Sequence, residues 1–528
     1  MNENERYALI PRPMGAVAKL GVGPKSILDG MVSDALAVVQ SKKQALAVAR
    51  FRIGNYEFRD PDYRQILIWA EALGIDAEEV VRGLEYSVWE QHREIKISFK
   101  VEDGSITSLC WNFDILPIIV FEWVDGLMIQ DIAFRGLATA SVAINLTFLR
   151  SFSSYFNNIK KIEFLNTPNL IFLSCEGNQL SELDLSNIPL LTELWCSYNQ
   201  LIKIDFSNTP LLTELSCSYN QLSDLDLSNT PDLIRLECSG NPLIELNLSD
   251  ISALTNLFCA DNHLNQIDLS NIPALTNLVC PDNHLSEIDL SNIPSLVGLG
   301  CDNNKLTKLN LSNLPVLRIL WCNNNQLTEL DLSNMPALTE LHCGCNQLTV
   351  FDLSNNRVLT ELWCEKNQLT ELDIPNIPAL TYLNCHDNQL TELDLSNSPV
   401  LTKLECTGNQ LTKLDLSNTP ALTGLHCGGN QLTVLDLSNT SALTELGCSD
   451  NQLTELDLSN NLVVKKLWCD NNYIKELNLS NISELTELNC EKNNISKIDI
   501  RSLTKLKIFI CDPSVIVIKL PTQTFQNE

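Results

Sequence analysis

A cysteine recurs every 21 residues along most of this chain, and this fixed period limits the possible folds more than any other feature. Seventeen cysteines follow one another at that spacing from Cys175 to Cys511, and of the nineteen in the chain only Cys110 and Cys345 fall outside it. A constant period of about 20–50 residues is typical of repeat architectures, in which each copy is one structural unit stacked on the next. The sequence therefore predicts an elongated array of coils rather than one globular core.

The copies share more than the cysteine. Aligned on it, they read Leu-x-x-Leu-x-Cys-x-x-Asn-x-Leu-x-x-Leu-Asp-Leu-Ser-Asn-x-Pro-x, and the asparagine is present in sixteen of the seventeen copies, the last having Ser514 instead. A degenerate copy at 149–168 precedes the first cysteine and has Ser154 at the thiol position. Terminal copies that depart from the consensus are expected, because an open stack requires capping repeats at its ends.

This pattern resembles the leucine-rich repeat family, whose motif is matched at Leu191, Leu194, Cys196, Asn199 and Leu201. The resemblance covers about residues 149–520 and is strongest to the short bacterial type with nested halves. It implies a parallel sheet on a concave, partner-binding face, and extended or turn segments on the convex face. Most of the 21-residue copies have a proline near the turn, and this short period leaves no room for a convex helix.

The part before the repeats has a different pattern and predicts helices followed by strands. We expect helices over 23–51, over 62–74 with a stop at Gly74, and over 76–85 with Asp76 as N-cap. From residue 93 the polarity alternates as in paired strands, with a turn at Asp103 and Gly104. The expected fold class is α+β: a helical N-terminal domain (1–92), a β-rich cap (93–148), the solenoid (149–520) and a tail (521–528).

Charge and composition exclude several classes of partner. The net charge is −29, and residues 1–148, with 15 Lys and Arg against 20 Asp and Glu, carry only −5 of it, which leaves −24 on the repeats. Nucleic acids and anionic membranes require clustered Lys and Arg, so we expect neither as partner. The sequence has no secretory signal, and a regular ladder of free thiols favours a cytoplasmic location; export by a signal-less route is the alternative.

Three repeated columns are interpreted as structural. An inward thiol acts as a small hydrophobe, because a straight row of thiols does not offer zinc a tetrahedral set. The asparagines are expected to bond turn backbone. Nine residues after each cysteine is an Asp, replaced by Asn at Asn247, Asn310 and Asn478; we expect a solvated or turn-bonded row rather than calcium sites, with mutual repulsion raising some pKa values. His263 and His284 should stack without a third ligand, and no metal or cofactor is predicted.

The columns that vary between copies carry the functional prediction, since the fold does not dictate them. All four tryptophans of the solenoid fall in the outward position just before the cysteine, and the position two residues earlier is also mixed. Exposed aromatic residues are preferred interface anchors. The predicted partner-binding residues are Trp321, His342, Trp363, Tyr382, Glu340, Glu361, Ile319, Trp195, Trp468 and Phe258.

The sequence thus predicts a protein-binding scaffold without catalytic activity. The segment GVGPKS at 21–26 is not a phosphate loop, because Pro24 replaces a glycine and no strand precedes it. Two alternatives stay open at this point. One is an exported bacterial effector or adhesin that binds a host protein or glycan, and the other is an enzyme in the N-terminal domain that the repeats target.

Overall fold

The computed structural model describes residues 50–53, 56–73, 76–82, 97–102, 105–112, 128–135, 141–372, 374 and 377–525. The chain divides into two compact units, Met1–Leu212 and Thr213–Glu528. The domain limits expected at residues 92, 148 and 520 stay predictions.

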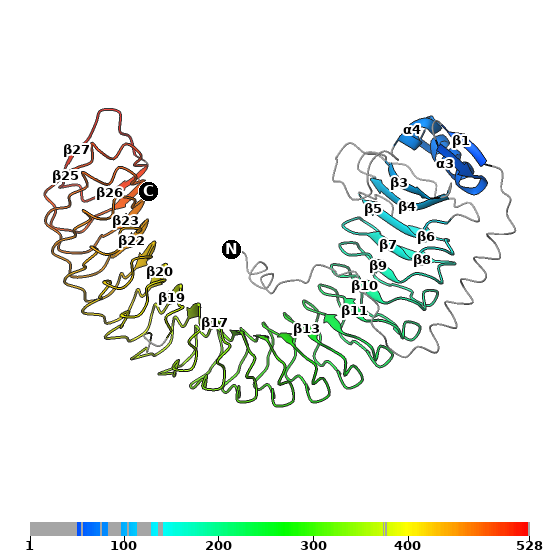
Figure 1. Cartoon of the computed structure of the whole chain (residues 1–528), viewed down its shortest axis with the longest axis horizontal. Helices are drawn as coiled ribbons and strands as arrows, with labels where there is room; N and C mark the ends of the chain where they lie inside the picture. Colours follow the sequence, from blue (N-terminus) through cyan, green and yellow to red (C-terminus); the bar gives the residue numbers. More distant parts are fainter. Residues whose placement is uncertain are drawn as a thin grey trace. The chain divides into compact units, whose positions relative to one another are not determined.

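The first unit opens with a small α/β element followed by short strands (Figure 1). Its elements are β1 (Arg50–Ile53), β2 (Tyr56–Arg59), α3 (Asp60–Leu73), α4 (Ala77–Arg82), β3 (Ile97–Glu102), β4 (Ser105–Asn112), β5 (Asp131–Arg135), β6 (Ser141–Ile144), β7 (Ser151–Ser154), β8 (Lys161–Phe164), β9 (Phe172–Ser174) and β10 (Glu193–Trp195).

Two of the three helix predictions are confirmed. Helix α3 starts two residues before the expected 62 and ends at Leu73, and α4 begins after Asp76, whose Oδ1 accepts the N–H of Glu78 at 2.8 Å as an N-cap does. The helix expected over 23–51, like the segment 21–26, lies mostly outside the described residues. The predicted C-terminal end of this helix is wrong, because Arg50 and Phe51 belong to β1, which pairs antiparallel with β2.

The predicted strand pair after residue 93 is confirmed as an antiparallel hairpin of β3 and β4, whose expected turn residues lie outside the described part. Parallel pairing then runs from β4 through β5, β7 and β9 to β10, so the hairpin ends the sheet of this unit and shields its edge strand. Asp62 of α3 fixes the hairpin by accepting the N–H of Ile106 at 3.0 Å, and burial raises the pKa of this carboxyl to about 6.

The second unit repeats one three-residue strand per coil, with the strands on the inner side of the curved stack (Figure 1). The strands are β11 (Glu214–Ser216), β12 (Arg235–Glu237), β13 (Asn256–Phe258), β14 (Asn277–Val279), β15 (Gly298–Gly300), β16 (Ile319–Trp321), β17 (Glu340–His342), β18 (Glu361–Trp363), β19 (Tyr382–Asn384), β20 (Lys403–Glu405), β21 (Gly424–His426), β22 (Glu445–Gly447), β23 (Lys466–Trp468), β24 (Glu487–Asn489), β25 (Lys497–Asp499), β26 (Ile508–Ile510) and β27 (Ile516–Ile518).

Thiols and asparagines form ladders inside the coils of each unit, as predicted. The ladder cysteines from Cys175 to Cys469 are fully buried, and burial raises the thiol pKa, for Cys280 to about 12. Asn346 shows the asparagine pattern: its amide donates to Cys322 O of the preceding coil at 3.0 Å and to Cys343 O of its own coil at 3.1 Å. Its Oδ1 accepts the N–H of Leu327 at 3.0 Å. Each asparagine therefore joins two coils.

The aspartate column forms turns rather than a metal site. Asp331 Oδ1 accepts the N–H of Ser333 at 3.0 Å, and Asp352 bonds Ser354 in the same way at 2.8 Å. Bonds from the serine side chain and backbone lower the pKa of Asp331. The expectation that repulsion raises these pKa values is wrong for such positions, because donors adjacent to each carboxylate outweigh the neighbouring charge.

None of the helices in the described ranges has the length and apolarity needed to cross a membrane.

Candidate functional site

The two outward columns of the parallel sheet carry the candidate site in the second unit. In each strand from β11 to β24 the middle leucine is buried, as Leu341 is in β17, while the first and third residues lie on the opposite face. Strands β16 to β19 pair in register, so Trp321, His342 and Trp363 occupy one column, with Ile319, Glu340, Glu361 and Tyr382 in the other. The alternation of a β-strand places these side chains together, as predicted.

Four rings from these strands form an unbroken row. The ring centroids of Trp321 and His342 lie 5.6 Å apart and nearly parallel, those of His342 and Trp363 lie 5.2 Å apart, and those of Trp363 and Tyr382 lie 4.7 Å apart at an interplanar angle of 16°. The last step is diagonal, from the third residue of β18 to the first of β19. We call Trp321, His342, Trp363 and Tyr382 the aromatic row.

Trp321 differs from the expectation of an exposed anchor, because only 5% of it is accessible. The indole lies against Gly300, where a Cβ would stand 3.8 Å from its Cε3 atom, and stacks on His342 on the other side. Its Nε1 donates to Glu340 Oε1 at 2.8 Å. Trp321 lies in the outward column as predicted, but its neighbours bury the indole. Its role is therefore to hold the row in place, and the rings accessible to a partner are those of Trp363 and Tyr382.

Carboxylates border the row on both sides. His342 Nε2 lies 3.1 Å from Glu340 Oε1. Burial by itself favours the protonated form of Glu340, but the contacts with His342 and Trp321 outweigh burial and lower the pKa of this carboxyl. Tyr382 Oη donates to Glu405 Oε1 at 2.9 Å, and burial together with this bond raises the pKa of the phenol.

Two further acidic residues come from the position just after the cysteine, which our sequence reading did not single out. Asp302 is 5% exposed and accepts the N–H of Asn323 at 2.8 Å, and burial raises its pKa to about 6. Glu365 lies over Gly344, where an added Cβ would stand 2.6 Å from its Cδ. The sequence could have indicated these two residues, because the position just after the cysteine also varies from copy to copy.

The remaining predicted residues do not join the row. Phe258 lies on β13, where the guanidinium of Arg235 sits 4.8 Å from its ring centroid. Trp468 on β23 contacts Lys466, at 5.8 Å from its ring, and His426, whose centroid is 5.9 Å away. Trp195 belongs to the first unit, is 38% exposed, and meets Phe172 edge-on at 5.4 Å.

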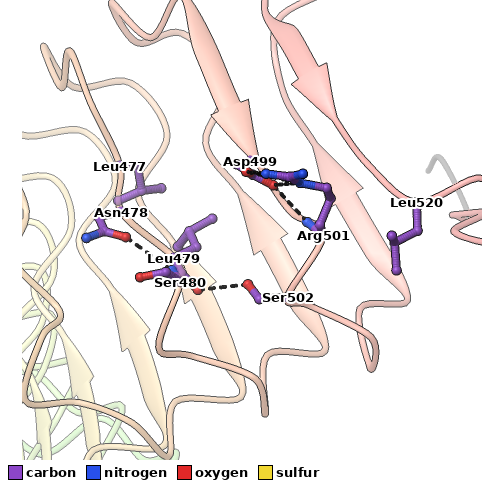
Figure 2. Close-up of a pocket in the computed structure, with 8 residues that line it drawn as sticks. All are labelled: Leu477, Asn478, Leu479, Ser480, Asp499, Arg501, Ser502 and Leu520. Atoms are coloured by element: carbon purple, nitrogen blue, oxygen red, sulfur yellow. Dashed lines mark hydrogen bonds and ion pairs between the residues drawn. The ribbon is translucent and has the colours of Figure 1, made fainter.

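Two other features of the described residues were considered as sites. His263 and His284 stack as predicted, with centroids 5.9 Å apart, and do not belong to a group of three metal-ligating side chains. A wide, shallow hollow of about 570 Å³ near β25 is lined by Asp499, Arg501 and neighbouring coil residues (Figure 2). Its two charged residues pair with each other, since Arg501 donates to both oxygens of Asp499 and lowers the pKa of that carboxyl to about 2.

One group of three in the described ranges could hold a metal ion. Glu340, His342 and Glu361 each offer one ligand atom, and these atoms all lie within 4.8 Å of one another. No cofactor or metal was expected from the sequence, although all three residues were predicted as partner contacts.

The comparisons with known proteins agree with the fold and with the ladder. The family model for leucine-rich repeats (two copies) matches residues 315–355, which contain strands β16 and β17, and residues 357–397, which contain β18 and β19. The functional domain of InlJ from Listeria monocytogenes, which includes a cysteine ladder, is 32% identical, with 63% of this chain and 70% of that chain covered and a TM-score of 0.52. No curated protein matches the chain.

Two further solved structures extend the likeness over more of the chain. YopM from Yersinia enterocolitica WA-314 is 25% identical, with 87% of this chain and 99% of that chain covered and a TM-score of 0.62. The plant peptide hormone receptor RGFR1, solved in complex with RGF2, is 20% identical over 74% of this chain and 76% of that chain, with a TM-score of 0.58, and shares the fold alone. With its repeated motif, its ladder of buried thiols and its identity to the InlJ domain, the chain belongs to the leucine-rich repeat family and is of the bacterial type.

Proposed function

We propose that this protein is a protein-binding scaffold whose binding surface is the aromatic row with its carboxylate border. The observation that carries the proposal is the unbroken contact of four rings from four successive strands. The fold does not require rings there, because the same columns hold Gly298 and Gly300 in β15 and Gly447 in β22. Aromatic residues surrounded by polar neighbours are typical of interface hot spots.

The charges of this surface indicate the chemistry of the partner. Asp302, Glu340, Glu361, Glu365 and Glu405 all lie on or beside the row, and the chain carries a net charge of −29. A partner that inserts Lys or Arg side chains would gain both cation–π contacts with the rings and charge complementarity with the carboxylates. We therefore infer a protein partner with a basic, partly apolar binding segment.

Two buried polar atoms support a partner at this place. Trp363 Nε1 and Glu365 Oε2 are shielded from solvent and have no hydrogen-bond partner among the described residues. Buried polar groups are nearly always bonded to protein, water or ligand, so such groups on a binding face need a specific explanation. A partner that turns these two side chains on docking, and then accepts from the indole and donates to the carboxylate, would satisfy both. RGFR1, which has the same fold, was solved in complex with RGF2.

Site-specific photo-crosslinking tests the proposal. A photoreactive residue replaces Lys403, which neighbours Tyr382 in the sheet, and in a second protein replaces Val350, an exposed residue between β17 and β18. A protein captured from position 403 and not from 350 is identified, and its affinity is measured against Trp363→Ala and Tyr382→Ala. Loss of a central aromatic anchor typically costs about 2 kcal/mol or more, a fall in affinity of about 30-fold.

The matched control is the double variant Asp331→Asn and Asp352→Asn, on the turn side of two of the same coils. Asn occupies this column naturally at Asn310, so the control should bind as the parent protein does. Unchanged affinity after loss of both rings, in a protein with unaltered circular dichroism, would place the binding site elsewhere and overturn the proposal.

The location of the protein is a separate question. The cytoplasmic prediction rested on free thiols, but these are buried throughout the ladder from Cys175 to Cys469. Burial protects thiols from oxidants in any compartment, so the ladder suits an exported protein as well. We keep the cytoplasm as our proposal, and detection of the protein in culture supernatant would replace it with export.

A further inference from the structure

The three metal-ligating side chains in the second unit lie on two adjacent strands. Glu340 and His342 are the outward residues of β17, and Glu361 is the register partner of Glu340 on β18. Like charges directly opposite each other destabilise a sheet, so the pair Glu340 and Glu361 needs a compensating positive charge.

The imidazole nitrogen of His342 lies close to a carboxylate oxygen of Glu340 without completing a hydrogen bond. His342 Nε2 is buried and has no hydrogen-bond partner among the described residues, although Glu340 Oε1 lies only 3.1 Å away. The contact has the length of an ion pair but not the angles of a hydrogen bond. An imidazole nitrogen in this position, next to two carboxylates, has the arrangement of a metal ligand.

Neighbouring groups already hold two of the ligands in place. The His342 ring lies between Trp321 and Trp363, with centroid distances of 5.6 and 5.2 Å. Glu340 receives the indole N–H of Trp321 at 2.8 Å. Metal ligands are characteristically oriented by such outer hydrogen bonds. The fold therefore already orders these two side chains, and an ion that binds them loses little free energy to conformational entropy.

The donor set selects the kind of ion. Calcium takes about 6–8 oxygen ligands, and magnesium about six in a near-ideal octahedron, whereas one imidazole nitrogen with two carboxylates is a zinc-type set. Zinc bonds of about 2.0–2.2 Å in a tetrahedron put ligand atoms about 3.3–3.6 Å apart. The contact of 3.1 Å between His342 and Glu340 is close to this value, and small side-chain rotations bring in the atom of Glu361, which lies within 4.8 Å.

We propose that Glu340, His342 and Glu361 form a binding site for Zn²⁺ or a similar transition-metal dication on the sheet face, with the fourth position open to water. The ion neutralises the opposed carboxylates of Glu340 and Glu361, and it leaves the rings of Trp363 and Tyr382 and the remaining carboxylates of the border to a partner. The proposal does not depend on a protein partner, because its test uses the metal alone.

The test begins with removal of two half-exposed thiols that would also bind zinc, which are the half-exposed ones among the cysteines whose side chains the structure describes. Cys345 becomes Asn, as Asn324 is in the preceding coil, and Cys511 becomes Ser, as Ser154 is at the equivalent position of the first copy. Into this full-length protein Co²⁺ is titrated, followed by Zn²⁺ as competitor. We expect one equivalent of Co²⁺ with the visible absorption of a tetrahedral site, quenching of tryptophan fluorescence, and displacement by Zn²⁺.

Substitutions of the ligands give the decisive comparison. His342→Gln and Glu361→Gln should each lower the affinity for both ions at least about tenfold and abolish the cobalt absorption. His426→Gln is the matched control, because His426 is in the same outward column but not in a metal-ligating group of three in the described ranges. It should bind as the parent protein does.

Two outcomes would overturn the proposal. One is the absence of a tetrahedral cobalt spectrum. The other is equal binding by His342→Gln and the parent protein, which would assign the ion to scattered surface carboxylates. Circular dichroism of each metal-free variant verifies the fold, and if His342→Gln is misfolded, Glu361→Gln decides the question alone.

Discussion

Trp321 donates its indole hydrogen to Glu340 across two adjacent strands, with 2.8 Å between Nε1 and Oε1. The bond joins a buried ring to a carboxylate that also faces His342 at 3.1 Å. Trp321 is therefore a supporting residue of the surface. It fixes Glu340 and stacks on His342, while the accessible rings of the row are those of the next coils.

The first prediction isolates this bond. Trp321→Phe keeps a ring against His342 but removes the donor, which leaves Glu340 without one of its partners. Loss of a hydrogen bond to a charged, partly buried acceptor costs about 1–3 kcal/mol. The midpoint of urea unfolding, followed by circular dichroism, should fall accordingly. Trp468→Phe, in the same column on β23, should change the midpoint far less, and equal effects would refute the role of the bond.

A second prediction concerns pH and Asp302. Burial raises the pKa of this carboxyl from 3.8 to about 6. The native state therefore prefers the protonated form, which contributes fully to stability below pH 3.8 and is lost as the pH rises through about 6. Asp302→Asn cannot ionise, and Asn323 occupies the same position in the next coil. The substitution should raise the free energy of unfolding at pH 8 by up to about 3 kcal/mol, with little effect at pH 4.

Asp331→Asn is the control for this prediction, because the pKa of Asp331 is shifted in the opposite direction to that of Asp302. Serine donors lower the pKa of Asp331, so its contribution is present above the unfolded pKa and is lost as the pH falls through the lower folded value. Melting curves between pH 3 and 8 should show no gain at pH 8 for this variant. If Asp302→Asn also showed none, the pKa of this carboxyl would not be raised in the folded protein.

The third prediction concerns the asparagine ladder. Asn346→Ala removes two bonds to cysteine carbonyls of adjacent coils and the acceptor for Leu327 N–H. Buried backbone groups left unpaired cost about 1–3 kcal/mol each. A loss of at least about 2 kcal/mol is expected in the unfolding free energy of the affected coils. Protection of the Leu327 amide from hydrogen exchange should fall selectively, and uniform loss across the stack would contradict the local role.

Much of this fold was predictable because one period sets every coil. The alternation around Leu341 placed Glu340 and His342 on one face before any coordinates were known, and the inward cysteine followed from the same alternation. The turn role of Asp331 was also foreseen. The lowered pKa of Asp331 was not foreseen, because the direction of the shift depends on which donors contact the carboxylate. The spacing of the repeats does not show that the serine N–H group is closer than the next charge.

The site was predicted as a set of columns and not as a set of contacts. Spacing identifies which residues share a face, but it does not show that Trp321 is covered by its neighbours or that Glu365 lies over Gly344. The metal-ligating group was missed for the same reason. Glu340 and His342 are two residues apart and Glu361 lies one coil later, and no linear motif brings those three positions together.

A fourth prediction concerns thiol reactivity. Cys345 and Cys511 are half-buried, whereas the ladder cysteines before Cys511 are buried and burial raises their pKa. Among the eighteen described cysteines, these two should be alkylated in the native protein at pH 8, and the others only after denaturation. Mass-spectrometric mapping of the labelled peptides measures this. Rapid native labelling of Cys406, in the middle of the stack, would show that the coils open far more easily than the structure implies.

The last prediction concerns the coil as the unit of folding. Stability in such arrays is nearly a sum over coils and their interfaces, so removal of whole coils should be tolerated. Deletion of residues 386–427, which is two periods, joins Cys385 directly to the residue that follows Cys427 in the same register. The thiol and asparagine ladders then continue without a gap, since Asn388 is replaced by Asn430. We expect a soluble protein with a slightly lower melting temperature.

Deletion of residues 386–396 is the matched comparison, because it removes about half a period and shifts every later leucine out of register with the core. That protein should aggregate or lose cooperative unfolding. If the two deletions were equally damaging, the 21-residue coil would not be the folding unit. The two-period deletion also leaves the strands of the aromatic row intact up to Tyr382, so the same protein should retain Co²⁺ binding at Glu340, His342 and Glu361.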